Sequence, residues 1–168
     1  LRAFRPSGIA LLVALFAPGL ASAATVAVPP LVPKGVDAKV STNVSGLLSS
    51  ELDFSGAYET VKEIPAPASL NAACLTSSSC LAGIAKAAGT DAVMTGSVGP
   101  GPEGVQVYLV IYDVAKGAIT RKQTFNCAAD PSSLADNAGK WIKALVSGQA
   151  PAAVAAAEGP EKFEAPTD

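Results

Sequence analysis

Val105 to Val114 (VQVYLVIYDV) is the stretch of sequence that decides the fold. Its residues alternate with a period of two, which predicts a strand with two different sides. One side is apolar throughout, and its residues are Val105, Val107, Leu109 and Ile111. The other side mixes polar and aromatic residues, and these are Gln106, Tyr108, Val110 and Tyr112. We therefore expect a sheet in which helices cover the apolar side of this strand.

Two further strands flank this stretch. Asp91 to Val98 (DAVMTGSV) predicts a strand before it, and residues 99–104 (GPGPEG) predict the turn that joins the two. After the central stretch, Lys116-Gly117 turns the chain into Ala118 to Cys127. That last strand is polar over residues 121–124, which is typical of a sheet edge. The three strands should form a meander.

Two more strands and three helices complete the predicted domain. Thr25 to Val32 and Tyr58 to Ile64 are expected as strands, each bounded by prolines. The helices are expected between Asp37 and Gly56, from Cys80 to Ala88, and from Pro131 to Gly148. The order is β-α-β-α-β-β-β-α. This order predicts an α+β domain with a mixed sheet of about five strands and its helices packed on one face.

The last predicted helix has a strongly apolar side. Asp130 can cap it and Pro131 can open it, which is a common arrangement at a helix start. The apolar side consists of Leu134, Ala138, Trp141, Ile142 and Leu145. We therefore expect Trp141 to lie in the core.

The first residues have the three parts of a secretory signal peptide. Arg2 and Arg5 supply the positive start, and Ile9 to Phe16 (IALLVALF) is an apolar run. Ala21-Ser22-Ala23 is a small-x-small cleavage site. The apolar run is far shorter than the roughly 20 residues that a membrane-spanning helix needs. We therefore expect export to the periplasm with cleavage after Ala23, and not an integral membrane protein.

The chain accordingly divides into three segments. Residues 1–23 are the expected signal peptide, and residues 24–148 hold all the predicted strands and helices. Residues 149–168 consist mainly of Ala, Pro and Glu, with almost no large apolar residue. Because such a segment can bury little apolar surface, we expect it to be a disordered tail.

Composition excludes several classes of function. Loss of Arg2 and Arg5 with the signal leaves ten Lys and Arg against fourteen Asp and Glu, a net charge of −4. An acidic protein is poorly suited to nucleic acid. The chain contains no histidine, so the commonest general base and the commonest metal ligand are both missing. No carboxylate pair or phosphate loop is evident, and we expect neither a catalytic site nor a cofactor or metal site.

The three cysteines have more than one possible arrangement. Cys74 and Cys80 are separated by five residues, and Cys127 stands alone. Because cysteines of exported proteins usually pair, a Cys74–Cys80 disulfide is the preferred prediction. A bridge that involves Cys127, and no bridge at all, remain as alternatives. The spacing differs from the Cys-x-x-Cys of thioredoxin-like redox sites.

Two segments carry a resemblance to a known family. They are Gly89 to Val98 (GTDAVMTGSV) and Ile111 to Gly117 (IYDVAKG), and Val26 to Leu31 adds an Ala-Val-x-Pro-Leu-like first strand. Thr25 to Ser147 thereby resembles the amino-terminal domain of the translocation protein TolB, and also the related fold in the curli secretion protein CsgG. The shared segments are structural, so the resemblance implies a fold and an envelope setting without catalytic residues.

The sequence therefore favours a non-enzymatic periplasmic binding or scaffolding module that contacts another envelope protein. Tyr108 and Tyr112 are the candidate contact residues, because they share the side of their strand opposite Leu109. The alternative is a small-molecule binder or an enzyme whose site the sequence hides. A deep polar pocket with convergent carboxylates would favour that alternative, whereas a flat sheet face without a pocket would favour the module.

Export is directly testable. Protein isolated from a periplasmic extract should begin at Ala24, because cleavage is expected after Ala23. Amino-terminal sequencing or intact-mass measurement would show this. An uncleaved amino terminus, or recovery of the protein in the cytosol alone, would contradict the prediction.

Overall fold

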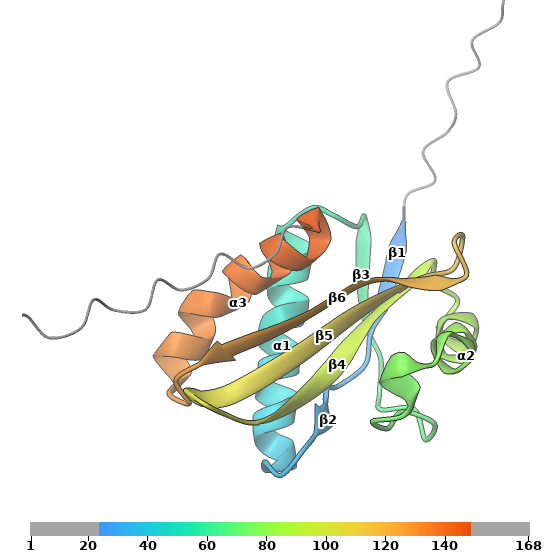
Figure 1. Ribbon diagram of the computed structural model, residues 1–168. Coiled ribbons are helices and arrows are strands. Elements are labelled where there is room, and N and C mark those ends of the chain that lie inside the picture. The colour runs from blue at the N-terminus through green and yellow to red at the C-terminus, as the bar shows by residue number, and fades with distance from the viewer. Residues whose placement is uncertain (1–23, 149–168) are drawn as a thin grey trace, which may run out of the picture.

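Three long antiparallel strands form the largest part of the sheet in this computed structural model, which describes residues 24–148 (Figure 1). They are β4 (Ala92–Gly101), β5 (Gly104–Asp113) and β6 (Ala118–Cys127). The meander is confirmed, and β6 is an edge strand as expected. The turn between β4 and β5 is shorter than expected. Residues 99–101 pair with residues 104–106, so the turn itself is Pro102-Glu103.

The remaining strands make the sheet mixed. β1 (Thr25–Val28) pairs in parallel with both β3 (Thr60–Glu63) and β4, giving the order β3-β1-β4-β5-β6. β2 (Val32–Pro33) also pairs in parallel with β4. The expected single strand from Thr25 to Val32 is thus divided in two. Pro29 and Pro30 lie in the break, where the chain loses two backbone donors.

Three α-helices follow the predicted order. α1 (Ala38–Phe54) begins after Asp37, whose side chain accepts a hydrogen bond from the Lys39 backbone amide. α2 (Ser78–Ala88) is preceded by the short 3-10 helix η1 (Cys74–Thr76), and its cap is Ser77. α3 (Pro131–Ser147) is capped by Asp130. The α+β class and the mixed sheet are therefore confirmed.

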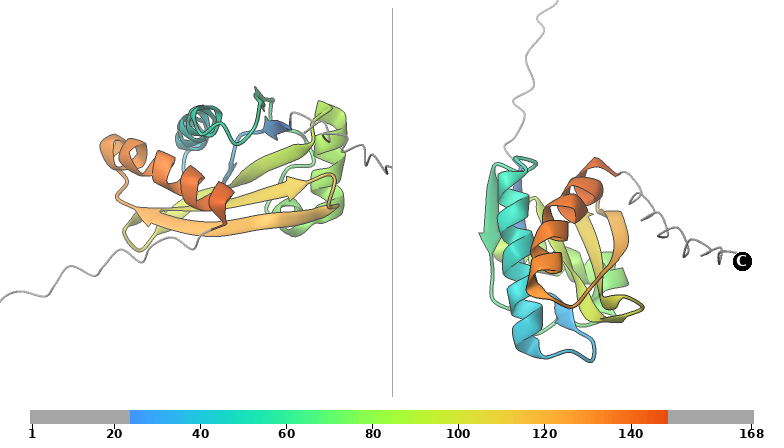
Figure 2. Two further views of the ribbon diagram at one scale, coloured as in Figure 1. Left: turned by 90° about the horizontal axis from the view of Figure 1, so that it is seen from above. Right: turned by 90° about the vertical axis from the view of Figure 1, so that its left-hand side faces the viewer.

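The placement of α2 differs from the prediction that all helices share one face. α1 and α3 lie together on one side of the sheet, as Figure 2 shows, and pack on the apolar side of β5. α2 packs on the opposite side, where Leu81 and Ile84 join a second apolar cluster with Val110 and Tyr112. Because the second side of β5 carries these apolar residues as well, it also needs a cover. We call the α1/α3 side the first side and the other the second side.

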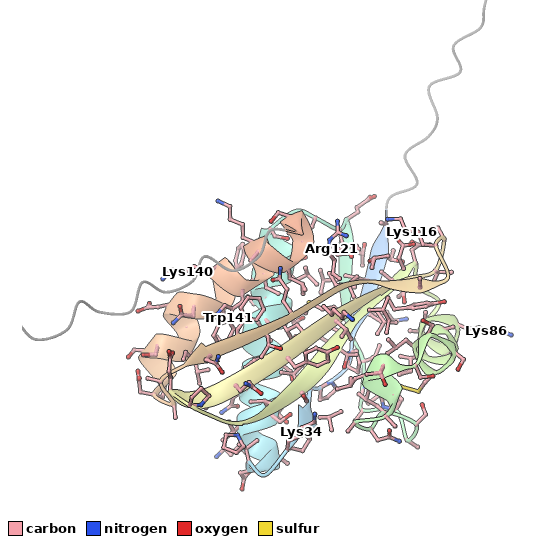
Figure 3. The ribbon with its side chains drawn as sticks, viewed as in Figure 1. Lys34, Lys86, Lys116, Arg121, Lys140 and Trp141 are labelled. Carbon is pink, nitrogen blue, oxygen red and sulfur yellow. A yellow bond between two sulfur atoms is a disulfide. The ribbon has the colours of Figure 1, made fainter. Side chains whose placement is uncertain are left out.

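The larger core lies between α1, α3 and the first side of the sheet. Trp141 projects into it from α3, as Figure 3 shows, and is 5% exposed. Its ring stacks on that of Phe125 in β6, with ring centroids 5.4 Å apart and planes inclined by 21°. The prediction that Trp141 lies in the core is confirmed. Its contact with Phe125 fixes α3 against the edge strand.

Within residues 24–148 no helix has the length and apolar character required to cross a membrane. The predicted signal peptide and the predicted tail lie outside the described residues.

Trp141 offers a test of this core. Trp141→Ala should lower the free energy of unfolding by about 3–5 kcal/mol, because it removes a buried ring and leaves a cavity beside Phe125. Phe54→Ala is the matched control, since Phe54 is 83% exposed and should cost about 0.5 kcal/mol or less. Denaturant unfolding of both variants measures the difference. If the two variants lost the same free energy of unfolding, Trp141 would not fix α3 to the sheet.

Candidate functional site

The second side of the three long strands is covered over only part of its length. α2 lies over the end that carries Val93, Val110 and Tyr112. At the other end no helix of the described chain lies in front of the strands, which face the viewer in Figure 1. The open strip consists of Gln106, Tyr108 and Thr124 from this uncovered part, Ser97 beside Tyr108, and two exposed lysines. The lysines are Lys34 in the adjoining loop and Lys122 in the edge strand β6, level with Val110.

Strand register brings these residues together. Ser97 pairs with Tyr108 across β4 and β5, and Tyr108 pairs with Thr124 across β5 and β6. Directly opposed residues of antiparallel strands project to the same side, so three hydroxyl groups form a row across the sheet. Lys122 is opposite Val110 and therefore also projects to the second side. Gln106 donates a hydrogen bond to the Asn126 side chain at 3.2 Å.

Lys34 reaches the strip from the loop between β2 and α1. Its backbone amide donates to the Val98 carbonyl at 2.7 Å. A Cβ atom on Gly99 would lie 2.8 Å from the Lys34 carbonyl oxygen, so glycine at position 99 is what lets this loop lie against β4. Lys34 appears at the lower edge of the sheet in Figure 3. The loop is thus held in place by the strand that it covers.

The strip is hollowed at one end. An open hollow of about 350 Å³ lies there, lined by Lys34, Ser97, Gln106, Tyr108 and Thr124 among others. These side chains supply hydroxyl, amide and ammonium groups around one aromatic ring. The hollow can therefore accept hydrogen-bonding groups and contact an apolar segment at Tyr108, and its lining contains no carboxylate.

The strip is basic. The second side of β4, β5 and β6 carries no Asp or Glu, whereas Lys34 and Lys122 are both exposed. Among residues 24–148 the ion pair formed is Lys116–Asp113 at 3.5 Å, and it does not involve either strip lysine. Both ammonium groups are consequently available to a binding partner.

The two tyrosines predicted as contact residues, Tyr108 and Tyr112, have different positions. Tyr108 is half-buried and lines the hollow. Tyr112 is 5% exposed and belongs to the apolar cluster under α2. The expectation that Tyr112 lies on a contact surface is therefore corrected, because α2 covers that end of the strand. Tyr108 stays as the candidate contact residue.

The Cys74–Cys80 disulfide is present, which confirms the preferred pairing. The bridge joins η1 to the first turn of α2, with Cα atoms 5.4 Å apart. Cys74 itself is buried in the cluster with Val110 and Tyr112, so the bridge links α2 to a residue that packs on the second side of the sheet. Cys127 is a free, buried thiol. Burial, and then the nearby carboxylates of Asp130 and Glu103, raise its pKa.

Metal-ligating side chains are not gathered in the part of the chain that the structure describes. Among residues 24–148 no three His, Cys, Asp or Glu side chains are placed to hold a metal ion. A second open hollow of about 340 Å³ lies beside α2, where Lys86, Asp91 and Tyr112 contribute to its lining. Asp91 there accepts hydrogen bonds from the backbone and hydroxyl of Thr25, both at 2.9 Å, and these lower its pKa. That carboxylate serves to join β1 to β4.

Comparison with known proteins identifies the family of this chain. Residues 17–120 match the model of the TolB amino-terminal domain family, which is more than half of the chain. The chain belongs to this family. The TolB part of the resemblance seen in the sequence is thereby supported, whereas the comparisons do not support the CsgG part. A comparison with curated proteins gave no match.

Several solved structures are similar to this TolB amino-terminal-domain family member. The PelC dodecamer of Paraburkholderia phytofirmans is 20% identical over 79% of this chain and 88% of that chain, with a TM-score of 0.48. TolB of Acinetobacter baumannii is 18% identical over 75% of this chain and 29% of that chain, with a TM-score of 0.49. The LpoB carboxy-terminal domain of Salmonella enterica is 15% identical over 67% of this chain and 87% of that chain, with a TM-score of 0.43.

Most of the open strip could not be identified from sequence. Tyr108 was found because the alternation in β5 is strong. Lys34 lies in a loop, and Lys122 depends on the pairing between β5 and β6, which shifts between Ile111 and Tyr112. The absence of carboxylates from the second side becomes visible once this pairing is known.

The two tyrosines should differ in their effect on stability. Tyr112→Ala should lower the free energy of unfolding by about 3 kcal/mol or more, because the ring is packed under α2. Tyr108→Ala should cost about 1 kcal/mol, as is typical of a partly exposed residue. Thermal or denaturant unfolding of both variants measures this. A Tyr112→Ala variant as stable as the unaltered protein would mean that α2 does not cover β5.

Proposed function

We propose that this protein is a non-enzymatic binding module, exported to the periplasm, that contacts another protein of the cell envelope through the open strip. The observation that carries the proposal is the position of Tyr108. It is an aromatic ring that remains partly exposed in the middle of a sheet side where no described helix covers it. Aromatic residues surrounded by hydrogen-bonding groups are typical anchors of protein interfaces.

Family membership supports an envelope setting. The TolB amino-terminal domain family takes its name from an envelope translocation protein, and the predicted signal peptide would carry this chain to the same compartment. The disulfide is consistent with an oxidising compartment, because cysteines rarely remain paired in the cytosol. A net charge of −2 for the chain makes nucleic acid a poor partner.

The geometry supports a protein partner better than a small molecule. Sites for small ligands usually enclose most of the ligand surface and are lined mainly by apolar groups. Here the hollow is open, and its lining consists largely of hydroxyl, amide and ammonium groups. A surface of this kind is better matched to a polar chain segment that extends beyond the hollow and across the neighbouring strands.

Site-specific photocrosslinking in intact cells tests the proposal. A photoreactive phenylalanine at Tyr108 or Thr124 should give discrete adducts with one envelope protein, because both positions face the proposed partner. Lys140, which is exposed on α3 on the first side of the sheet, is the control position (Figure 3). Tyr108→Ala should reduce recovery of that partner at least tenfold. Adducts at Lys140 but not at the strip would place the interface elsewhere, and adducts at neither position would contradict the module function.

A further inference from the structure

Resting on the proposed function, the geometry points to an acidic, extended protein segment as the occupant of the open strip, lying across the strands. The charge of the strip differs from that of the whole chain. The chain as a whole is acidic, with a net charge of −2, yet the second side of the three long strands carries lysines and no carboxylate. Lys34 and Lys122 are exposed, and neither is ion-paired within residues 24–148. Surfaces of one sign favour partners of the opposite sign.

Hydrogen-bonding groups between the two lysines support the same occupant. Tyr108 and Thr124 present hydroxyl groups in one row across β5 and β6, and Ser97, which is 4% exposed, continues the row at its buried end in β4. A hydroxyl group can donate to a carboxylate or to a backbone carbonyl oxygen. The ring of Tyr108 lies among these groups and can contact the aliphatic part of a Glu side chain. A segment with carboxylates at its two ends and polar backbone between them matches this order of groups.

The positions of the lysines set the spacing of the carboxylates. Lys34 lies over Gly99 in β4. Gly99 pairs with Gln106 in β5, and Gln106 pairs with Asn126 in β6, so these three residues lie on one line across the sheet. Lys122 is four residues further along β6. Gly99 and Lys122 are thus separated by two strand spacings across the sheet and by four residues along it. Their Cα atoms are therefore about 16 Å apart. An extended chain covers that distance in about five residues. Side chains of an extended chain alternate in direction, so two that face the sheet together are an even number of positions apart. The segment should therefore carry two acidic residues four positions apart, with the flexible lysine side chains covering the remaining distance.

The strip faces outwards from the middle of the sheet, so the segment would not pair as an additional strand. Its binding would depend on side-chain contacts and on charge. Ion pairs between exposed groups are weakened by salt, since the screening length falls to about 3 Å at 1 M salt. Binding of the segment should accordingly decrease steeply as salt is added.

Synthetic peptides provide the test, with the full chain in solution. The probe is a capped twelve-residue Gly/Ser peptide with two Glu residues four positions apart, and its analogue has Gln at both positions. In nuclear magnetic resonance titrations the Glu peptide should shift the amide signals of residues 97, 108 and 122–126. Its affinity should be at least tenfold higher than that of the Gln analogue, and 0.5 M NaCl should remove the difference.

Charge-reversed variants provide the matched control. Lys34→Glu with Lys122→Glu should lower affinity for the Glu peptide at least tenfold, while Lys140→Glu with Lys143→Glu, on α3, should leave it unchanged. All four lysines are exposed, so both variants should melt like the unaltered protein. A Glu peptide that binds no better than its Gln analogue would overturn the inference.

Further outcomes separate this inference from the proposed function. Strip cross-links that persist unchanged in the Lys34→Glu, Lys122→Glu variant would leave the module function intact and overturn the acidic partner. Binding to phosphatidylglycerol vesicles through the two lysines, without binding to the Glu peptide, would assign the strip to a lipid surface instead. Signals of residues 158–168 that change on charge reversal without any peptide would assign it to this chain's own acidic residues. Either result would overturn the inference that an acidic segment of another protein occupies the open strip.

Discussion

Strand β4 is buried from Ala92 to Gly99, and the rest of the domain is arranged around this condition. It pairs with β5 along one edge, and with β1 and β2 at the two ends of the other edge. Close pairing with β5 requires glycine at position 96, since a Cβ atom there would lie 1.8 Å from the Tyr108 carbonyl oxygen. Any larger residue would force the two strands apart. A strand enclosed in this way needs a cover on each side, which is why helices occur on both sides of the sheet.

The two covers differ in extent because the two sides of the sheet differ in composition. On the first side, apolar residues continue along the whole of β5, and two seventeen-residue helices cover them. On the second side, apolar residues end at Val110, and the eleven-residue α2 covers that part alone. The Cys74–Cys80 bridge strengthens the smaller cover by about 2 kcal/mol in the chain-entropy model. The polar remainder of that side is the open strip.

Sequence patterns predicted the elements well and their relative placement less well. Asp37, Asp130 and Gly148 act locally, so the helix ends that they define could be recognised without a structure. The side on which α2 packs depends on the apolar character of Val110 and Tyr112. The sequence pattern instead predicts Tyr112, together with Tyr108, as a contact residue. The position of Lys122 depends on the register shift in β6. Without that shift, alternation would have put Arg121 on the second side instead. No local pattern specifies such a shift.

The division of the second side has a consequence for how the domain can bind. Its apolar part is covered permanently, because exposing Val93, Val110 and Tyr112 to water would be unfavourable. Its polar part is stable in water without a cover, since hydroxyl, amide and ammonium groups are well hydrated. A partner at the open strip therefore displaces water and not a helix. Association needs no rearrangement of the fold, so the loss of hydration at the two lysines must be offset by the charges that replace it.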